Sequence, residues 1–250
     1  MAGSNRANYQ SSTYGDGFAD IYDDWYRNVT DIGGTVDLIT NLAQSHTILE
    51  LGVGTGRLAL PISATGASIC GVDSSAAMLD RLAKRDHLGA IETHRADMAQ
   101  WLPTGPFGVI FSAYNTFFNL VTLDDQDSCL ELVRERLEPG GRFVLEAFVP
   151  STSPDLPSRG VESRHTSDAT VLNVTIQEQS SSLVRGQSVE ITQAGVTLRP
   201  WRILFRTPTE LDDCATRHRL TLVDRWEDWR QTPFTDSSDH HVSVYAPIQR

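Results

Sequence analysis

The chain has 250 residues, of which 40% are hydrophobic and 21% are charged, and its formal net charge is −11. This composition is typical of one large globular domain, or of one domain with an insertion, and it excludes a disordered chain. No apolar run approaches the roughly 20 residues that span a bilayer, and the polar N-terminus lacks the apolar core of a secretory signal. An acidic surface repels phosphates. We therefore expect a cytoplasmic protein with no nucleic-acid partner and no membrane partner.

Strands and helices alternate in the first part of the chain. Strands are expected at 47–51, 68–72, 91–94, 107–112 and 142–147, and helices at 36–43, from 57, at 75–85 and at 124–137. Repeated strand–helix units predict a parallel sheet with right-handed crossovers.

The pattern changes after Pro150. Residues 151–168 are rich in Ser, Pro and Asp and predict a loop or lid, and period-two alternation at 172–177, 189–192 and 201–205 then predicts two or three antiparallel strands. The alternation slips near Pro200, which indicates a bulge or an edge strand. A helix at 209–218, capped by Thr209, and two strands at 219–226 and 241–246 complete the chain.

A glycine-rich turn joins the first strand to the next helix. Gly52, Gly54 and Gly56 stand at alternate positions, Glu50 precedes them by two residues, and Asp73 follows Gly52 by 21 residues. Glycines allow a tight turn and let a ligand approach bare backbone, while an acidic residue after the second strand can accept hydrogen bonds from a ribose. The spacing differs from the G-x-G-x-x-G of dinucleotide enzymes, which disfavours an NAD-dependent reductase.

This segment resembles motif I of the class I, Rossmann-like S-adenosylmethionine-dependent methyltransferases. The resemblance covers roughly residues 18–148, and it includes 71–75 with Met78 as a ribose-binding segment, 96–98 as an adenine-contacting segment, 107–119 and 137–142. It implies that S-adenosylmethionine is the cofactor and S-adenosylhomocysteine its product. The implied cofactor-binding residues in these segments are Glu50, Gly52, Gly54, Gly56, Arg57, Asp73, Ser74, Met78, Ala96, Asp97, Met98, Ala113 and Asn115.

The resemblance also implies the fold class, which is α/β. We expect a doubly wound, mostly parallel seven-stranded sheet with an antiparallel β insertion after strand five that caps the active site. The expected parts are an N-terminal lid segment at 1–35, the cofactor-binding core at 36–150, a substrate-cap insertion at 151–206 and the C-terminal part of the core at 207–250.

An aromatic segment lies near the N-terminus. Tyr14, Phe18, Tyr22, Trp25 and Tyr26 follow at spacings of four, four, three and one, which places most of them on one helical face. Such a helix either packs on the core or forms a lid over the cofactor, because aromatic faces attract a sulfonium cation. Under the second interpretation Tyr14 and Tyr22 join the cofactor-binding residues.

Candidates for catalysis and acceptor binding come from their positions. Ligands bind outside the carboxyl ends of the strands in such folds. The catalytic candidates are Glu146, His165 and His240, and the substrate-binding candidates are Tyr26, Tyr114, Phe118, Phe148 and Arg202. The three cysteines are far apart and the two adjacent histidines point to opposite faces of a strand, so we expect no metal site.

The predicted function is methyl transfer from S-adenosylmethionine to an N or O atom of a small molecule, and tailoring of a natural product is suggested by analogy. One alternative is a protein that binds the cofactor as a scaffold or sensor without methyl transfer. Another is an RNA methyltransferase, which the acidic charge and the lack of basic clusters disfavour. The expected partner is a small-molecule methyl acceptor, with a homodimer as one expected state.

Overall fold

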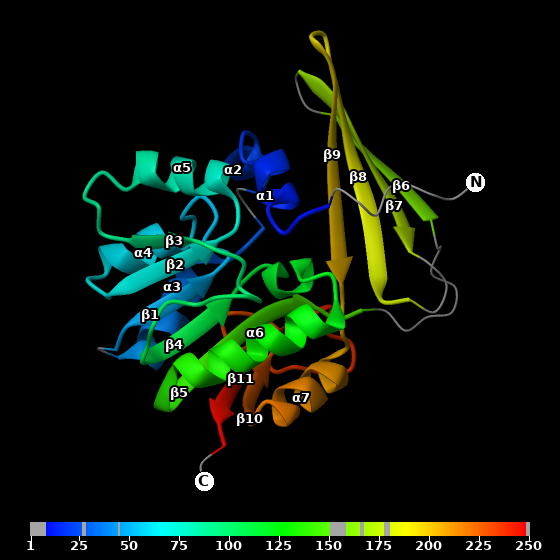
Figure 1. The fold of residues 1–250 in the computed structure, drawn as a ribbon. Coiled ribbons are helices and arrows are strands. Elements are labelled where there is room, and N and C mark those ends of the chain that lie inside the picture. Colours follow the sequence, from blue (N-terminus) through cyan, green and yellow to red (C-terminus); the bar gives the residue numbers. More distant parts are fainter. Residues whose placement is uncertain are drawn as a thin grey trace.

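A computed structural model describes residues 9–26, 29–44, 46–150, 159–165, 168–177 and 181–248. Its main sheet has the strand order β10-β11-β5-β4-β1-β2-β3 (Figure 1). The bounds are β1 Ile48–Leu51, β2 Ile69–Asp73, β3 Glu92–Arg95, β4 Phe107–Ser112, β5 Leu137–Phe148, β10 Leu220–Trp226 and β11 His240–Pro247. Only β11 runs antiparallel to its neighbours. The predicted mostly parallel, seven-stranded α/β sheet is confirmed.

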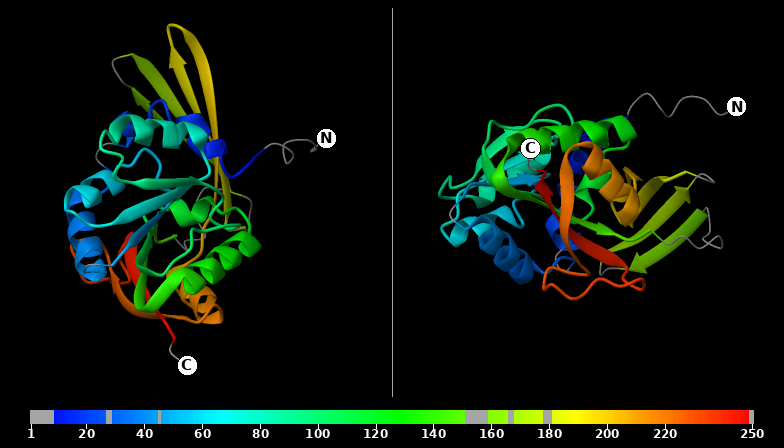
Figure 2. Two further views of the ribbon diagram at one scale, coloured as in Figure 1. Left: turned by 60° about the vertical axis from the view of Figure 1, so that its left-hand side comes forward. Right: turned by 90° about the horizontal axis from the view of Figure 1, so that it is seen from below.

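Helices cover both faces of this sheet (Figure 2). On one face, α3 (Ile32–Ala43), α4 (Ala59–Ala64) and α5 (Ala76–Arg85) bury apolar side chains such as Ile39 and Ile62. On the other face, α6 (Leu123–Arg136) and α7 (Pro208–Arg217) do the same. The central strands β1 and β4 are buried along their whole length, which explains why their sequences are mostly apolar without a polar residue at every second position. No helix in the described part of the chain is long and apolar enough to cross a membrane.

The insertion forms a separate antiparallel sheet in the order β6-β7-β8-β9 (Figure 1). Its strands are β6 Arg159–His165, β7 Ala169–Gln177, β8 Leu183–Thr192 and β9 Gly195–Leu204. We predicted two or three strands and a loop over 151–168. The loop prediction is wrong for 159–165, because β7 supplies the pairing that makes this weakly alternating segment a strand. Residues 151–158 lie outside the described residues.

Near Pro200 we predicted either a bulge or an edge strand, and Pro200 lies in the edge strand β9. The register of β9 with β8 runs from Thr192↔Gly195 to Leu183↔Leu204 without a shift, so the predicted bulge does not occur. An edge strand tolerates proline because one side of its backbone needs no ladder hydrogen bond.

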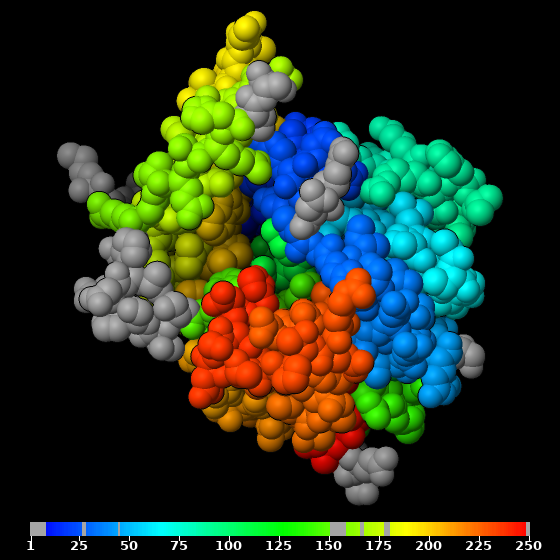
Figure 3. Space-filling model, turned by 180° about the vertical axis from the view of Figure 1, so that it is seen from behind, coloured from blue at the N-terminus to red at the C-terminus, as the bar shows by residue number. Residues whose placement is uncertain are grey.

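The N-terminal aromatic segment forms two short helices instead of one, α1 (Thr13–Phe18) and α2 (Tyr22–Trp25). The turn between them contains Asp20, whose carboxylate accepts hydrogen bonds from Arg199 of β9 at 2.7 and 2.9 Å. The spacing of the aromatic residues along the chain carries no sign of this contact with β9, so it predicted one helix. The insertion sheet thereby contacts the N-terminal helices, and the two lie side by side on the surface (Figure 3).

The start of α7 also differs from the prediction. Thr207, not Thr209, is the N-cap residue, and with Glu210 it forms a complete capping box around Pro208 at the first helical position. Proline fits there because its missing N–H has no partner in the first turn of a helix.

Candidate active site

A cavity of about 640 Å³ opens at the carboxyl ends of the central strands. The turns after β1, β2 and β3, the η1 turn (Thr116–Asn119) and α1 all contribute to its wall. The predicted cofactor residues that line it are Tyr14, Tyr22, Gly52, Gly54, Asp73, Ser74, Met78, Ala96, Asp97 and Met98. The structure therefore brings ten residues from four separated segments together around one space.

Two glycines of the turn are fixed by their surroundings. Gly52 has a φ of +71°, and a Cβ there would lie 2.3 Å from the Thr116 side chain. Gly56 has a φ of +77°, and a Cβ there would lie 2.8 Å from the Leu82 side chain of α5. Gly52 thus keeps the cavity open, whereas Gly56 serves the packing of α5 and lines neither described cavity.

Asp73 ends β2 and points back at the glycine turn. Its Oδ2 accepts a hydrogen bond from Gly54 N at 2.9 Å, and its Oδ1 accepts one from Ser75 N at 2.8 Å. Burial raises the pKa of this carboxyl to about 6, against the lowering effect of these hydrogen bonds. Each carboxylate oxygen has a second lone pair, so the group can also accept from a ligand.

A second cavity of about 300 Å³ adjoins the turn and is lined by Glu50, Arg57, Ala113 and Tyr114, among others. Here the described residues leave buried polar atoms without partners, namely Oε2 of Glu50 and Nε and Nη1 of Arg57. Burial raises the pKa of Glu50 well above its usual range, although the nearby Arg57 lowers it. Buried polar groups are rarely left unpaired in native proteins. These atoms therefore mark a place for a polar ligand.

Four tyrosines gather where the two cavities meet. Tyr22 lies 4.8 Å from Tyr26 between ring centroids, and Tyr26 lies 5.6 Å from Tyr114. The Arg57 guanidinium stands 5.6 Å from the Tyr114 ring. Burial raises the pKa of Tyr14 well above its usual range and that of Tyr22 to about 12, so both hydroxyls are neutral at pH 7.

Acidic residues that we did not predict hold the N-terminal helices onto the cavity. Asp16 accepts a hydrogen bond from Ser75 Oγ at 2.6 Å, and Asp23 accepts one from Thr55 Oγ1 at 2.6 Å. A Cβ at Gly15 would lie 2.4 Å from the Ser75 Cβ, so the helix approaches α5 closely. Ser11, Thr116, Asn119 and Leu120 also line the first cavity without having been predicted.

Glu146, the leading catalytic candidate, is half-buried near the end of β5. Its Oε2 accepts a hydrogen bond from Tyr114 N at 2.6 Å, and Trp229 lies beside it. Tyr114 and the next residue, Asn115, both have positive φ values, 49° and 60°. Asn115 Oδ1 in turn accepts from Phe148 N at 2.7 Å. Glu146 and Asn115 therefore hold the loop after β4, and Asn115 lines neither described cavity.

Three further candidates lie away from the cavities. His165 is exposed, and its Nδ1 lies 3.0 Å from Thr170 Oγ1. Arg202 contacts the Tyr9 ring at 4.6 Å on the other side of β9 from Arg199. Phe118 is fully buried in the core. None of the three lines either cavity. For His165 and Arg202 the reason is that period-two alternation does not say which face of a strand looks inward, whereas Phe118 lies in the η1 turn and packs into the core.

Two candidates, Phe148 and His240, lie near the end of β5, where we expected them. Phe148 is half-buried and packs edge-on against Phe118 and Phe205. His240 pairs with Phe148 in the sheet and its side chain is exposed.

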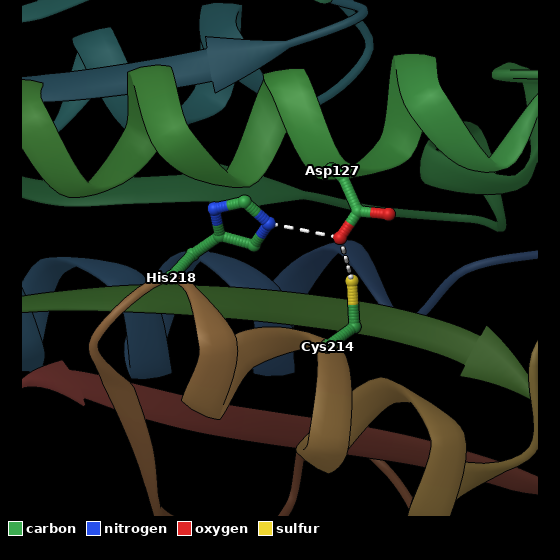
Figure 4. Close-up of side chains that lie close together, drawn as sticks. All are labelled: Asp127, Cys214 and His218. Carbon is green, nitrogen blue, oxygen red and sulfur yellow. Dashed lines mark hydrogen bonds and ion pairs between the residues drawn. The ribbon is translucent and has the colours of Figure 1, made fainter.

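Within the described residues, Asp127, Cys214 and His218 form a cluster whose ligand atoms lie within 4.8 Å of one another, the spacing of a metal site (Figure 4). Asp127 Oδ1 accepts from Cys214 Sγ at 3.1 Å, lies 2.8 Å from His218 Nε2, and pairs with Arg217 at 3.0 Å, while Arg206 is 3.5 Å from Oδ2. The two arginines already balance the carboxylate. We interpret the cluster as a hydrogen-bonded junction between α6 and α7.

The strand order, the glycine turn, the acidic residue after β2 and the paired cavities together define a methyltransferase of the S-adenosylmethionine-dependent class. Comparison with known proteins supports this class directly. The profile of a family described as "Methyltransferase domain" matches residues 48–141. The solved structure of the CcbJ methyltransferase from Streptomyces caelestis is 32% identical, with a TM-score of 0.90 over 96% of this chain and 100% of that one.

Two curated relatives are also similar. The dTDP-4-amino-2,3,4,6-tetradeoxy-D-glucose N,N-dimethyltransferase of Saccharopolyspora spinosa is 29% identical over 223 residues, 85% of each chain. The cypemycin N-terminal methyltransferase of Streptomyces sp is 31% identical over 106 residues, 42% of this chain and 43% of the relative. In the matches to the first curated relatives, the chain spans between 43% and 60% of the relative's own length. The chain belongs to the class I S-adenosylmethionine-dependent methyltransferases.

Proposed function

We propose that this chain transfers a methyl group from S-adenosylmethionine to an amino nitrogen of a small molecule, in the tailoring of a natural product. When bound, the cofactor supplies a methyl group already activated by its sulfonium. The single observation that carries the proposal is the set of buried, unpartnered polar atoms on Glu50 and Arg57 beside the glycine turn. They fit the zwitterionic end of an amino acid, because Arg57 can donate to a carboxylate and Glu50 can accept from an ammonium.

The larger cavity then holds the adenosine. Asp73 accepts from the ribose hydroxyls, and Asp97 faces the adenine amine. Asp97 Oδ1 already accepts from Ala99 N at 2.9 Å, which orients the carboxylate. Met78 and Met98, both nearly buried, supply the apolar walls for the base.

The surroundings of the sulfonium favour an amine over a hydroxyl acceptor. The tyrosine rings shield the positive charge, since their faces attract cations. Among the described residues that line the two cavities there is no histidine, and Glu146 is engaged by Tyr114 N. A hydroxyl acceptor needs a base during attack, whereas an amine that has lost its proton does not. By their names, one curated relative is an N,N-dimethyltransferase of an amino sugar and the other methylates an N-terminus.

The acceptor enters beside the end of β5 and the inner side of the insertion, which we propose as the substrate cap. Tyr26, Tyr114, Phe148 and His240 are the residues of that region we assign to acceptor binding. The net charge of −11 works against a nucleic-acid acceptor. The buried cysteines Cys70, Cys129 and Cys214 form no disulfide, which fits the reducing environment of a cytoplasm.

Replacing Arg57 with Met tests whether the unpartnered polar atoms of Arg57 bind the cofactor, because it removes the charge and keeps the side-chain length. Calorimetry with S-adenosylhomocysteine should show affinity lowered about 10- to 100-fold, as expected for a buried charged hydrogen bond. The matched variant Arg142→Met, in the middle of β5 and outside both cavities, should bind like the wild type. Equal affinity of the Arg57 variant, with its fold verified by circular dichroism, would overturn the proposed cofactor orientation.

A further inference from the structure

A buried glutamine lies where three parts of the molecule meet. Gln126 belongs to the first turn of α6, and its side chain is fully buried. Its Nε2 donates hydrogen bonds to Leu120 O at 3.1 Å and to Leu204 O at 2.7 Å. Its Oε1 accepts a hydrogen bond from Nε of Arg206 at 2.6 Å. An amide nitrogen carries two hydrogens, so Gln126 uses both of its donors.

The two carbonyl groups that Gln126 binds belong to different parts of the enzyme. Leu120 follows the η1 turn and, with Thr116 and Asn119, lines the larger cavity. Leu204 is the last residue of β9, the strand through which the chain leaves the insertion sheet. The end of β9 lies beside the turn that precedes α6 (Figure 1), and β9 contacts η1 directly. One amide therefore joins the wall of the cofactor cavity to the base of the insertion sheet.

Arg206 fixes the direction in which this amide points. Arg206 is 8% exposed, and its Nη2 lies 3.5 Å from Oδ2 of Asp127. If the Gln126 amide turned over, its oxygen would face two carbonyl oxygens and its NH₂ group would face a guanidinium. All three attractive contacts would become repulsive, and buried polar groups without partners are costly. The amide therefore has one orientation, in which it holds both carbonyl groups at once.

This arrangement links cofactor binding to the order of the insertion sheet. A molecule that packs against Asn119 and Leu120 restricts the η1 turn, because both residues line the cavity. Part of the ordering of Leu204 is then already complete, since Gln126 holds it to Leu120. Ordering at one site that spares ordering at a second site produces coupling without a change of shape.

We propose that Gln126 is a positioning residue of this methyltransferase, which transmits cofactor binding to the insertion sheet. Gln126 lines neither of the two cavities and acts through Leu120 and Leu204. The coupling is reciprocal, so a change that steadies the insertion sheet also raises cofactor affinity. The coupling rests on the cofactor of the family and not on the methyl acceptor. Its use, to steady the cap once the methyl donor is bound, rests on the proposed function.

Hydrogen exchange of the full chain, with and without saturating S-adenosylhomocysteine, tests this inference without any acceptor. In the wild type, binding should slow exchange at residues 116–122 and, at least threefold, at residues 201–206. Gln126→Met keeps the side-chain length but removes all three hydrogen bonds. In this variant the ligand should still slow residues 116–122, whereas exchange at 201–206 should be the same with and without it. A purely structural role would instead raise exchange in both states and preserve the effect of the ligand.

Gln177→Met is the matched control. Gln177 also donates to a backbone carbonyl, that of Ser181 at 3.0 Å, but this bond lies within the insertion. The control variant should therefore keep the ligand-dependent slowing at residues 201–206.

Gln126→Glu is the second test variant. Its carboxylate fills the same space and can pair with Arg206, but it has no hydrogen for the two carbonyl groups, so it should behave like the Met variant. The inference is overturned if the ligand leaves residues 201–206 unchanged in the wild type, if either Gln126 variant keeps the slowing there, or if Gln177→Met loses it. Failure of both Gln126 variants to fold or to bind the ligand would give the side chain a structural role only and would equally overturn it.

Discussion

Asp73 is the residue whose ionisation should control cofactor affinity. Its pKa lies near 6 in the folded protein, above the ordinary 3.8, because it is buried. A carboxylate accepts ribose hydrogen bonds better than a neutral carboxyl, so affinity for S-adenosylhomocysteine should fall as pH drops from 7 to 5, by up to about tenfold per pH unit. Asp73→Asn should weaken binding at pH 7 by about 1–3 kcal/mol and remove this part of the pH dependence.

The same raised pKa makes the stability of the ligand-free protein change with pH in the opposite direction to cofactor affinity. Between pH 3.8 and about 6 the folded state binds more protons at Asp73 than the unfolded state does. This carboxyl therefore lowers stability as pH rises through that window, and the Asn variant should lack the effect in urea unfolding. Identical pH profiles for affinity in wild type and variant would remove Asp73 from the ribose site.

Substitutions at Glu146 can distinguish a positioning role of this residue from a catalytic one. Its hydrogen bond with Tyr114 N holds two residues in the left-handed region, and a glutamine oxygen can accept that bond equally well. We expect Glu146→Gln to keep turnover within about tenfold of wild type, whereas a group acting as general base contributes about 10²–10⁴-fold. Glu146→Ala should lose more, because it leaves Tyr114 N buried without an acceptor. A drop of about a hundredfold or more in the Gln variant, with unchanged cofactor affinity, would instead make Glu146 the base.

Residue types and spacing could predict the cavity but not everything that faces it. The glycines, Asp73 and Asp97 follow strand ends, and parallel strands bring their carboxyl ends to one edge, so order along the chain predicts proximity. Asp16 and Asp23 could not be predicted, because their partners Ser75 and Thr55 lie 59 and 32 positions away with no shared pattern. His165 and Arg202 lie away from the two cavities for a different reason. Alternation along a strand gives two faces, and only a contact such as that of Arg199 with Asp20 shows which one looks inward.

At the scale of elements, Arg199 connects the insertion sheet to the N-terminal helices. Its side chain is 7% exposed and pairs with Asp20 and, at 2.9 Å, with Glu190 of β8. Arg199→Met should release the turn between α1 and α2, which carry Tyr14 and Tyr22 to the cavity. Hydrogen exchange should accelerate at residues 13–26, and cofactor affinity should fall about three- to tenfold, a loss of ~1 kcal/mol.

The control for this prediction is Arg202→Met, three residues along β9 and on the opposite side of the strand from Arg199. It should leave exchange at residues 13–26 unchanged. Equal exchange in wild type and the Arg199 variant would show that the helices stay in place without the insertion sheet.

At the scale of the whole molecule, the core could be predicted because each of its elements is specified locally. Apolar runs of four to six residues, glycine turns and amphipathic helices recur in order, and β10 and β11 were expected within one residue of where they lie. The insertion was less predictable, since β6 has a single apolar residue, Val161, and depends on β7 for its pairing. The division of the aromatic segment into α1 and α2 likewise depends on β9, almost 180 positions away.

The central claim is that this chain methylates a small-molecule amine. The most direct measurement is nuclear magnetic resonance of the product formed from S-adenosylmethionine with a ¹³C-labelled methyl group and a dTDP-linked amino sugar, with the matching hydroxy sugar and a panel of other small amines as parallel acceptors. We predict that the label moves to nitrogen in at least one amine, that the hydroxy sugar stays unlabelled, and that the Arg57→Met variant forms far less product. Cofactor binding without labelled product from any amine, or labelled oxygen in the hydroxy sugar, would contradict it.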